Sequence, residues 1–254
     1  MKLHFKKIGE GQPILILHGL FGSSDNWQTH AKKLAENYCV YLVDQRNHGH
    51  SPHSEEFSYD LMAADLLELI AAEGLRDVIL IGHSMGGKTI MRFAQEHDFL
   101  IDKMIVVDMG IKAYAPHHDV IFQGLYNVKV PNVASRKEAE ERLLEYVTEP
   151  STAQFLMKNL YWKTQTELAW RFNLDVLFEK INVIIQGLPL KEINVNTLFL
   201  VGGKSGYVPK ADFPSILEMV PQAKFVVIEQ SGHWVHAETP VEFMVAVQDF
   251  LANS

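Results

Sequence analysis

The sequence predicts an α/β fold with a doubly wound, parallel sheet. Several short apolar runs, rich in Val and Ile, do not alternate with polar residues, which is typical of strands buried on both faces. These runs cover residues 13–17, 39–43, 78–81, 104–107, 198–201 and 225–228. Longer amphipathic segments, such as residues 61–70, separate the runs and predict helices that cover the sheet.

The composition indicates one domain with an insertion. The chain has 254 residues, 47% of them hydrophobic, so it is long for one domain, short for two, and apolar enough for a large core. The net charge is −8 and no cluster of Lys and Arg stands out, so we expect no nucleic-acid partner. Cys39 lies in an apolar run and is expected to be a buried structural thiol. No pattern of His, Cys and Asp has the spacing of metal ligands, so neither a metal nor a cofactor is expected.

The N-terminal segment and the hydropathy pattern bear on location. The first residues carry positive charge, but no apolar stretch of the kind found in signal peptides follows them. No apolar run reaches about 18 residues, the length that predicts a membrane span. A cytoplasmic protein is therefore expected, and its oligomeric state is left open.

Residues 112–190 interrupt the alternation of strands and helices. One helix is expected after the capping box formed by Ser135 and Glu138, and a second helical run is expected from Ser151 to Trp162. A mostly helical insertion between two strands of one sheet is typical of a cap. The expected division is a helical cap of residues 112–190 inserted into a core of residues 1–111 and 191–254.

Ser84 lies in the segment Gly82-His-Ser-Met-Gly86, which matches the pattern G-x-S-x-G. The pattern follows a buried strand and precedes a helical segment, which is the context of a serine nucleophile. The turn is so sharp that side chains two positions before and after the serine would collide, which explains Gly82 and Gly86. Ser84 is then expected at the carboxyl edge of the sheet, where ligands bind in open α/β folds.

The loop His18-Gly-Leu-Phe-Gly22 follows the first buried strand. One backbone N–H of this loop, expected to be that of Leu20, can join the N–H of Met85, the residue after the nucleophile. Two such donors would form an oxyanion hole. We interpret His18 itself as a structural residue that is hydrogen-bonded within its loop.

A serine nucleophile needs a base, and location selects His233 among the twelve histidines. His233 lies just after the last buried strand and well after Ser84, as the chain order of nucleophile, acid and histidine requires. His236 is the rival, but it lies nearer the final helix and is interpreted as structural. We therefore expect His233 to be the general base.

The acid that would orient this histidine is missing from its usual place. It is expected in the loop after the penultimate strand, where the sequence has Ser205 and Gly206. Asp212 and Asp44 are alternatives that the sequence leaves open. We also interpret Asp44 as a brace of its own loop, charge-paired with Arg46.

The segments HGLFGSSDNW, VDQRNHGHSP, GHSMGGK and GHWVHAE together resemble the α/β-hydrolase superfamily. The resemblance is closest to the YbfF-type bacterial esterases and their mitochondrial relatives. The motifs extend from His18 to Glu238, so the resemblance covers nearly the whole chain. It implies an eight-stranded sheet, a helical cap and serine-dependent hydrolysis of short-chain acyl esters and of some acyl-CoA thioesters.

The same resemblance implies a source for the acid. Relatives of this type that lack the acid in the usual loop take it from the end of the strand after the nucleophile helix, and the matching residue is Asp108. That strand is expected to be a direct neighbour of the nucleophile strand, about 4.8 Å away. An Asp at the end of an apolar strand is costly to bury without a partner, and His233 would supply one.

The expected function is that of a carboxylesterase or acyl-thioesterase with the triad Ser84, His233 and Asp108. Its expected partner is a small-molecule acyl ester or thioester of short to medium chain length. The candidates to line the substrate pocket are Phe21, His83, Trp162, Tyr207 and Trp234. A cofactor-free C–C bond hydrolase or a perhydrolase would use the same triad. A small-molecule receptor on a hydrolase scaffold is the alternative from a different functional class.

Overall fold

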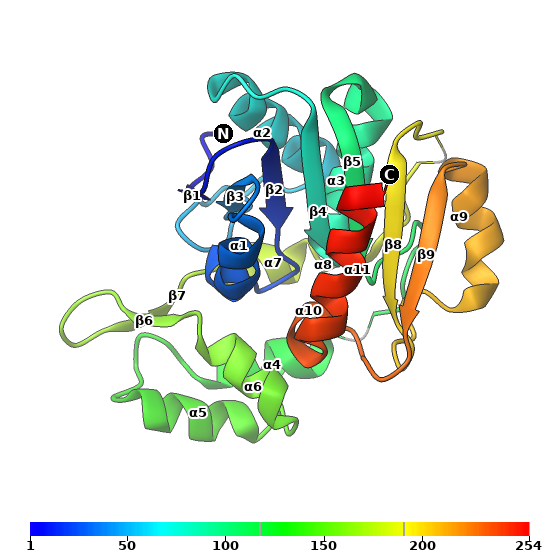
Figure 1. The fold of residues 1–254 in the computed structure, drawn as a ribbon. Helices are drawn as coiled ribbons and strands as arrows, with labels where there is room; N and C mark the ends of the chain where they lie inside the picture. Colours follow the sequence, from blue (N-terminus) through cyan, green and yellow to red (C-terminus); the bar gives the residue numbers. More distant parts are fainter. Residues whose placement is uncertain (117, 190, 254) are drawn as a thin grey trace.

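The computed structural model describes residues 1–116, 118–189 and 191–253, and a seven-stranded sheet lies at its centre (Figure 1). The strands are β1 (Phe5–Ile8), β2 (Pro13–Leu17), β3 (Cys39–Val43), β4 (Val78–His83), β5 (Ile101–Val107), β8 (Asn196–Gly202) and β9 (Ala223–Ile228). Their spatial order is β1-β3-β2-β4-β5-β8-β9. β1 is antiparallel to β3, and the other neighbouring strands are parallel. The predicted strands and the mostly parallel sheet are confirmed.

Within the described residues the sheet has seven strands, one fewer than the resemblance implies. β1 is the edge strand on its side. The residues before it run to helix α2 (Tyr59–Ala72) instead of adding a strand. The Met1 ammonium lies 2.6 Å from the carboxylate of Asp65 on that helix, and Leu3 is buried.

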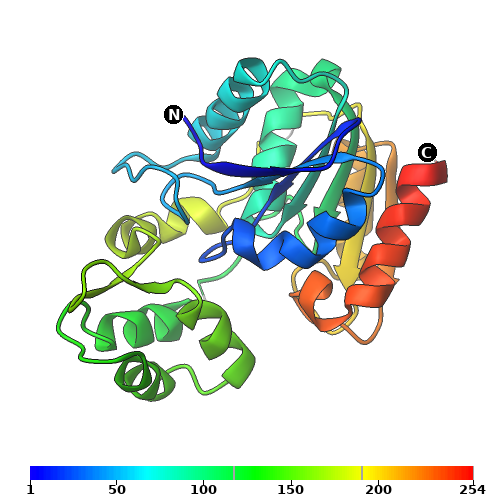
Figure 2. The ribbon, with the colours of Figure 1, turned by 60° about the vertical axis from the view of Figure 1, so that its left-hand side comes forward.

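Alternate residues of the strands point to opposite faces and form two apolar cores. On β4, Leu80 belongs to one core, whereas Ile79 and Ile81 belong to the other. The first core is covered by α2, α3 (Met85–His97) and α9 (Phe213–Met219). The second core is covered by α1 (Gln28–Leu34) and α11 (Pro240–Asn253). Figure 2 shows helices on both sides of the sheet, which explains why its inner strands are continuous apolar runs.

Short helical turns lie in the connections of the core. They are η1 (Ser24–Trp27), η2 (Asp98–Leu100), η3 (Lys210–Asp212) and α10 (Val235–Glu238). Cys39 is buried in β3, as predicted for a structural thiol. Across the described ranges, no helix combines the length and the apolar character needed to cross a bilayer.

Between β5 and β8 the chain forms a separate layer beyond the carboxyl ends of the strands (Figure 1). Its elements are α4 (Asp119–Asn127), α5 (Arg136–Leu144), α6 (Pro150–Met157), β6 (Leu160–Trp162), β7 (Leu168–Trp170), α7 (Leu174–Glu179) and α8 (Ile181–Ile185). α5 follows Ser135, whose hydroxyl accepts a hydrogen bond from the N–H of Glu138 at 3.1 Å, so the predicted helix start is confirmed.

The second predicted helical run of this layer is wrong at both ends. α6 begins at Pro150, and the carboxylate of Glu149 accepts hydrogen bonds from the N–H groups of Ser151 and Thr152. The helix ends at Met157, and the following residues form the antiparallel hairpin β6–β7. Each strand of this hairpin has only three residues, too few for alternation to be recognised in the sequence.

Candidate active site

Ser84 occupies a strained turn between β4 and α3. Its backbone has φ 53° and ψ −117°, and a non-glycine residue in such a sparsely populated region costs about 1–3 kcal/mol. A Cβ at Gly82 would lie 2.4 Å from the carbonyl oxygen of Gly86, and a Cβ at Gly86 would lie 2.4 Å from that of Leu17. Neither position has room for a side chain, and this explains why both residues of the G-x-S-x-G pattern are glycine.

Asp108 and His233 form a hydrogen-bonded pair at the sheet edge that carries Ser84. Asp108 follows β5 and is fully buried, and its Oδ2 lies 2.7 Å from Nδ1 of His233 in the loop after β9. Because a carboxylate only accepts, Nδ1 carries the proton, and Nε2 of the neutral imidazole is unprotonated. β4 and β5 are hydrogen-bonded neighbours, which brings Asp108 to the same edge as Ser84.

Ser205 lies in the loop where the usual acid was expected, and it hydrogen-bonds to Asp108. Its hydroxyl donates to Oδ2 of Asp108 at 2.5 Å, the oxygen that also accepts from His233. The other carboxylate oxygen accepts from the N–H of Gly202 at 3.0 Å. The Ser205 oxygen in turn accepts from the N–H of Tyr207 at 3.2 Å. The buried carboxylate is thereby hydrogen-bonded at both oxygens, as a buried charge requires.

The two alternative acids are engaged elsewhere. Asp44 accepts hydrogen bonds from the N–H groups of Ser24 at 2.6 Å and His50 at 2.9 Å, and so braces its loop. A carboxylate oxygen of Asp212 lies 2.6 Å from Nζ of Lys112. Of the three carboxylates, Asp108 is the one that hydrogen-bonds to His233.

The expected charge pair between Asp44 and Arg46 is wrong. The Arg46 guanidinium pairs with Asp65 on α2 through two hydrogen bonds, Nε to Oδ2 at 2.7 Å and Nη2 to Oδ1 at 3.0 Å. Both side chains are buried, and the two parallel bonds match the shape of the guanidinium. The carboxylate of Asp44 binds backbone N–H groups instead.

The His233 ring is held by its neighbours. Tyr207 stacks on it, with ring centroids 3.9 Å apart and an interplanar angle of 14°. Nε2 of His83 lies 3.0 Å from the carbonyl oxygen of His233. Burial, together with the nearby His233 and His236, lowers the pKa of His83 well below its ordinary value of 6.5. His83 is therefore neutral and donates to this carbonyl from Nε2.

The rival histidine lies deeper in the core. His236 is buried and stacks on Trp27, with ring centroids 4.1 Å apart. Burial lowers the pKa of His236 to about 3, and its carbonyl oxygen lies 2.8 Å from Nε2 of His30. These contacts give His236 a structural place behind the site.

Two buried histidines shape the loop after β2. The N–H of Gln45 donates to Nε2 of His18 at 3.1 Å, and the N–H of Phe21 donates to Nε2 of His48 at 3.2 Å. Burial lowers the pKa of both histidines, that of His48 to about 3, so both are neutral and each Nε2 is an acceptor. His18 is thus hydrogen-bonded into the structure, in agreement with its interpretation from the sequence.

This loop brings Leu20 close to Ser84. Leu20 and Met85 line the same narrow cavity beside Ser84. Met85 is the first residue of α3, and the N–H groups in the first turn of a helix have no acceptor within the helix. The N–H of Met85 is therefore suited to bind an oxygen at this point.

A cavity of about 240 Å³ contains Ser84 and His233 in its wall. Apolar side chains from the core loops and from helices α4 and α6 form most of it. Its lining residues are Leu20, Phe21, His83, Ser84, His118, Ile121, Thr152, Phe155, Leu156, Tyr207, His233 and Trp234. Among the described side chains, no group of three or more His, Cys, Asp or Glu residues is placed to hold a metal ion.

The structure places most, but not all, of the expected pocket residues in this wall. Phe21, His83, Tyr207 and Trp234 line the cavity. Trp162 does not, because it lies on the hairpin β6–β7 with 46% of its surface exposed. Sequence reasoning did not assign the contributions of α6 to the wall. Their spacing of three and four residues is the signal that could have found them: Thr152, Phe155 and Leu156.

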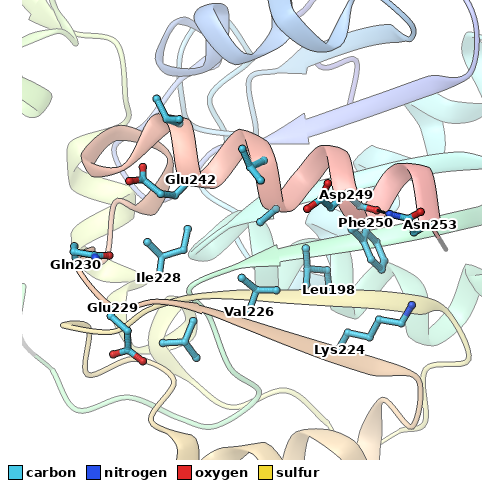
Figure 3. A pocket seen from close by; sticks show the side chains of 14 residues that line it. Leu198, Lys224, Val226, Ile228, Glu229, Gln230, Glu242, Asp249, Phe250 and Asn253 are labelled. Carbon is cyan, nitrogen blue, oxygen red and sulfur yellow. Dashed lines mark hydrogen bonds between the residues drawn. The ribbon is translucent and has the colours of Figure 1, made fainter.

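A larger groove of about 680 Å³ lies at the far edge of the sheet, between β9 and α11 (Figure 3). Its floor is apolar, with Val226 and Ile228 on the strand and Phe250 on the helix. Neither Ser84 nor His233 is among the residues that line it. The smaller cavity is therefore the one whose wall contains both Ser84 and His233.

Comparison with known proteins shows that the chain is similar to esterases and lipases. Residues 12–240 match the family described as alpha/beta hydrolase fold. The chain is 34% identical to esterase YbfF of Escherichia coli, over 94% of this chain and 92% of the relative. It is 38% identical to the sn-1-specific diacylglycerol lipase ABHD11 of Mus musculus, over 94% of this chain and 80% of the relative. A solved structure described as a marine microorganism esterase superposes with a TM-score of 0.96 and 40% identity, covering 98% of this chain and 99% of that one.

Proposed function

The chain belongs to the α/β-hydrolase fold family, and from this premise we propose that it is a serine esterase that cleaves acyl esters through an acyl-enzyme. The observation that carries the proposal is the 2.7 Å hydrogen bond between His233 and the buried Asp108, next to a serine on a strained elbow. His233 combines a buried carboxylate at Nδ1 with a ring that lines the same cavity as Ser84. A purely structural histidine would not require this combination. The similarity to an esterase and a lipase over nearly the whole chain supports the same reaction class.

In the proposed reaction the Ser84 hydroxyl attacks the acyl carbonyl carbon. Nε2 of His233 takes the hydroxyl proton, and the Asp108 carboxylate stabilises the imidazolium that forms. The oxygen of the tetrahedral intermediate is bound by the N–H groups of Leu20 and Met85, and losing one such donor typically costs about 100- to 1000-fold in rate. His233 then protonates the leaving alcohol or thiol. Water, activated by the same histidine, releases the acid from Ser84.

The cavity supports short- to medium-chain acyl groups as substrates. A volume of about 240 Å³ lies below the range of about 300–1,000 Å³ that is usual for drug-sized ligands. Phe155 and Trp234 face each other across 5.9 Å in its wall and give it an apolar, aromatic character. The net charge of −8 does not attract an anionic CoA thioester through the overall field, so we expect oxygen esters to be turned over better than acyl-CoA.

The test is a chain-length series of p-nitrophenyl esters, from acetate to palmitate, with the matching acyl-CoA series. The proposal expects the highest kcat/KM between acetate and octanoate, and loss of all turnover in Ser84→Ala. Binding of an ester without its hydrolysis would favour the receptor alternative. Equal turnover in Ser84→Ala would refute a serine mechanism altogether.

A further inference from the structure

Lys88 is a buried cation that the proposed reaction does not use. It lies one turn after the nucleophile on α3, where its N–H donates to the carbonyl oxygen of Ser84 at 3.1 Å, and its side chain is fully buried. Burial lowers the pKa of Lys88 to about 8, so the side chain still carries its charge at neutral pH. Within the described part of the chain, no carboxylate forms an ion pair with it. A charge in this position is costly unless hydrogen bonds compensate for the lost water.

Backbone carbonyl groups compensate for the lost water. They lie where the chain leaves the core for the layer between β5 and β8, here called the cap, and where it returns. Nζ of Lys88 donates to the carbonyl oxygen of Lys112, on the way out, at 3.2 Å. It also donates to the carbonyl oxygens of Ile185, at 3.4 Å, and Gln186, on the way back. One ammonium thus binds both crossing segments to the nucleophile helix.

The two crossing segments are themselves joined at this point. The N–H of Tyr114 donates to the carbonyl oxygen of Ile185 at 2.8 Å, and the N–H of Leu188 donates to that of Ile111 at 2.9 Å. Lys88 therefore sits where α3 and both crossings meet. Hydrogen bonds from a charged donor are about twice as strong as neutral ones, so this contact should dominate the attachment.

The same ammonium reaches the catalytic histidine through two tyrosines. Nζ of Lys88 lies 4.9 Å from the ring centroid of Tyr114, within the range of a cation–π contact. The hydroxyl of Tyr114 accepts from the N–H of Gly110 at 2.8 Å and donates to the carbonyl oxygen of Tyr207 at 3.1 Å. Tyr207 is the residue whose ring stacks on His233.

We propose that Lys88 is a positioning residue that fastens both cap crossings to the nucleophile helix and, through Tyr114 and Tyr207, holds the His233 ring in register with Ser84. The kinetic part of this inference rests on the proposed esterase function. The attachment of the crossings does not, since it can be measured without turnover.

The test uses Lys88→Met, which keeps the length of the side chain and removes its charge and its donors. Lys103→Met is the matched control, because Nζ of Lys103 also donates to a backbone carbonyl oxygen, that of Leu251 at 2.8 Å. This contact lies on the far side of the sheet from the cap. Hydrogen exchange is followed at the amides of Tyr114 and Leu188. The kcat and KM for p-nitrophenyl butyrate are measured in parallel.

For Lys88→Met we expect exchange at these two amides to quicken about tenfold or more, as for the loss of a hydrogen bond from a charged donor. We also expect kcat to fall about tenfold and KM to change less. The substitution would displace His233 but leave the cavity open to the substrate. Lys103→Met should match the wild type in both measurements. Exchange and kcat in Lys88→Met equal to those of the control would overturn the proposal.

A second variant separates the two parts of the inference and does not depend on the folding of Lys88→Met. Tyr114→Phe keeps the ring under the ammonium and removes the hydroxyl that supports Tyr207. It should lower kcat severalfold while leaving exchange at Leu188 unchanged. An unaltered kcat in Tyr114→Phe would refute the link to His233. Absence of ester hydrolysis by the wild type would refute the proposed function alone, since the exchange measurement stands without it.

Discussion

Replacing Asp108 by Asn removes the charge of the proposed acid and keeps its shape. Asn also tolerates the positive φ of 47° at this position, so the variant should fold. The carboxylate oxygen lies 2.7 Å from Nδ1 of His233. At that distance a charge pair is worth about 6 kcal/mol with an effective dielectric constant of about 20. If the neutral amide recovers half of this, about 3 kcal/mol is lost at the transition state, which corresponds to a fall in kcat of about 100-fold.

The assay is steady-state hydrolysis of p-nitrophenyl butyrate, with circular dichroism to show that the variant is folded. We expect kcat to fall between about 100-fold and the 10,000-fold measured for the same change in a well-studied Ser-His-Asp enzyme. Asp212→Asn is the matched control, and its turnover should stay near that of the wild type. Near-normal turnover in Asp108→Asn, with collapse in Asp212→Asn, would refute the reasoning.

Moving the acid gives a gain-of-function form of the same prediction. The Ser205 oxygen lies 2.5 Å from the Asp108 oxygen that binds His233, so a carboxylate at position 205 is within reach of that histidine. Asp108→Gly empties the original position and accepts its positive φ. Adding Ser205→Asp to Asp108→Gly should raise kcat at least about tenfold over Asp108→Gly alone, since an anion again stabilises the imidazolium. If kcat of the double variant does not exceed that of Asp108→Gly alone, a carboxylate at position 205 cannot replace the one at position 108.

Three further predictions concern stability and selectivity. Burial lowers the pKa of His48 and His236 to about 3 in the folded protein, so below pH 6.5 the unfolded chain binds more protons. Lowering the pH from 7 to 5 should therefore reduce the free energy of unfolding by about 2 kcal/mol for each histidine, and a flat profile in urea titrations would contradict this. The pKa of Lys88, about 8 when folded against 10.5 as the ordinary value, makes stability rise with pH across that interval. The rise should reach about 3 kcal/mol in the wild type and be absent in Lys88→Met, when both are unfolded in urea at pH 8 and at pH 10.5. Phe155→Ala enlarges the cavity wall and should raise the ratio of kcat/KM for octanoate over butyrate about tenfold, whereas an unchanged ratio would place the acyl chain elsewhere.

The core of the fold was predictable because its signals are local. Runs such as Val78–Ile81 are apolar on both faces because helices cover both sides of the sheet. Burial on both faces therefore produces a continuous apolar run that can be recognised in the sequence. The elbow was predictable for a similar reason. Gly82 and Gly86 are required by contacts of 2.4 Å that any Cβ would make, so the local pattern carries the geometry.

Features that depend on contacts between distant segments were not predictable from the residues alone. Asp108 was assigned through a resemblance, and its place at the end of an apolar strand supported the assignment without excluding Asp212. In the sequence, Ser205 marked only the absence of the usual acid. Its role depends on a partner 97 positions earlier in the chain. The partner of Arg46 was missed because Asp65 is brought to it by the packing of α2. The hairpin β6–β7 was missed because its strands are too short to show a period.

The central claim is that Ser84 is the nucleophile of a triad completed by His233 and Asp108. Its most direct test is covalent labelling with a fluorophosphonate, followed by intact mass and peptide mapping. The account predicts one adduct per chain, located on Ser84, that is absent in Ser84→Ala and forms far more slowly in Asp108→Asn and in His233→Ala. An adduct on another residue, or labelling that survives Ser84→Ala unchanged, would contradict it.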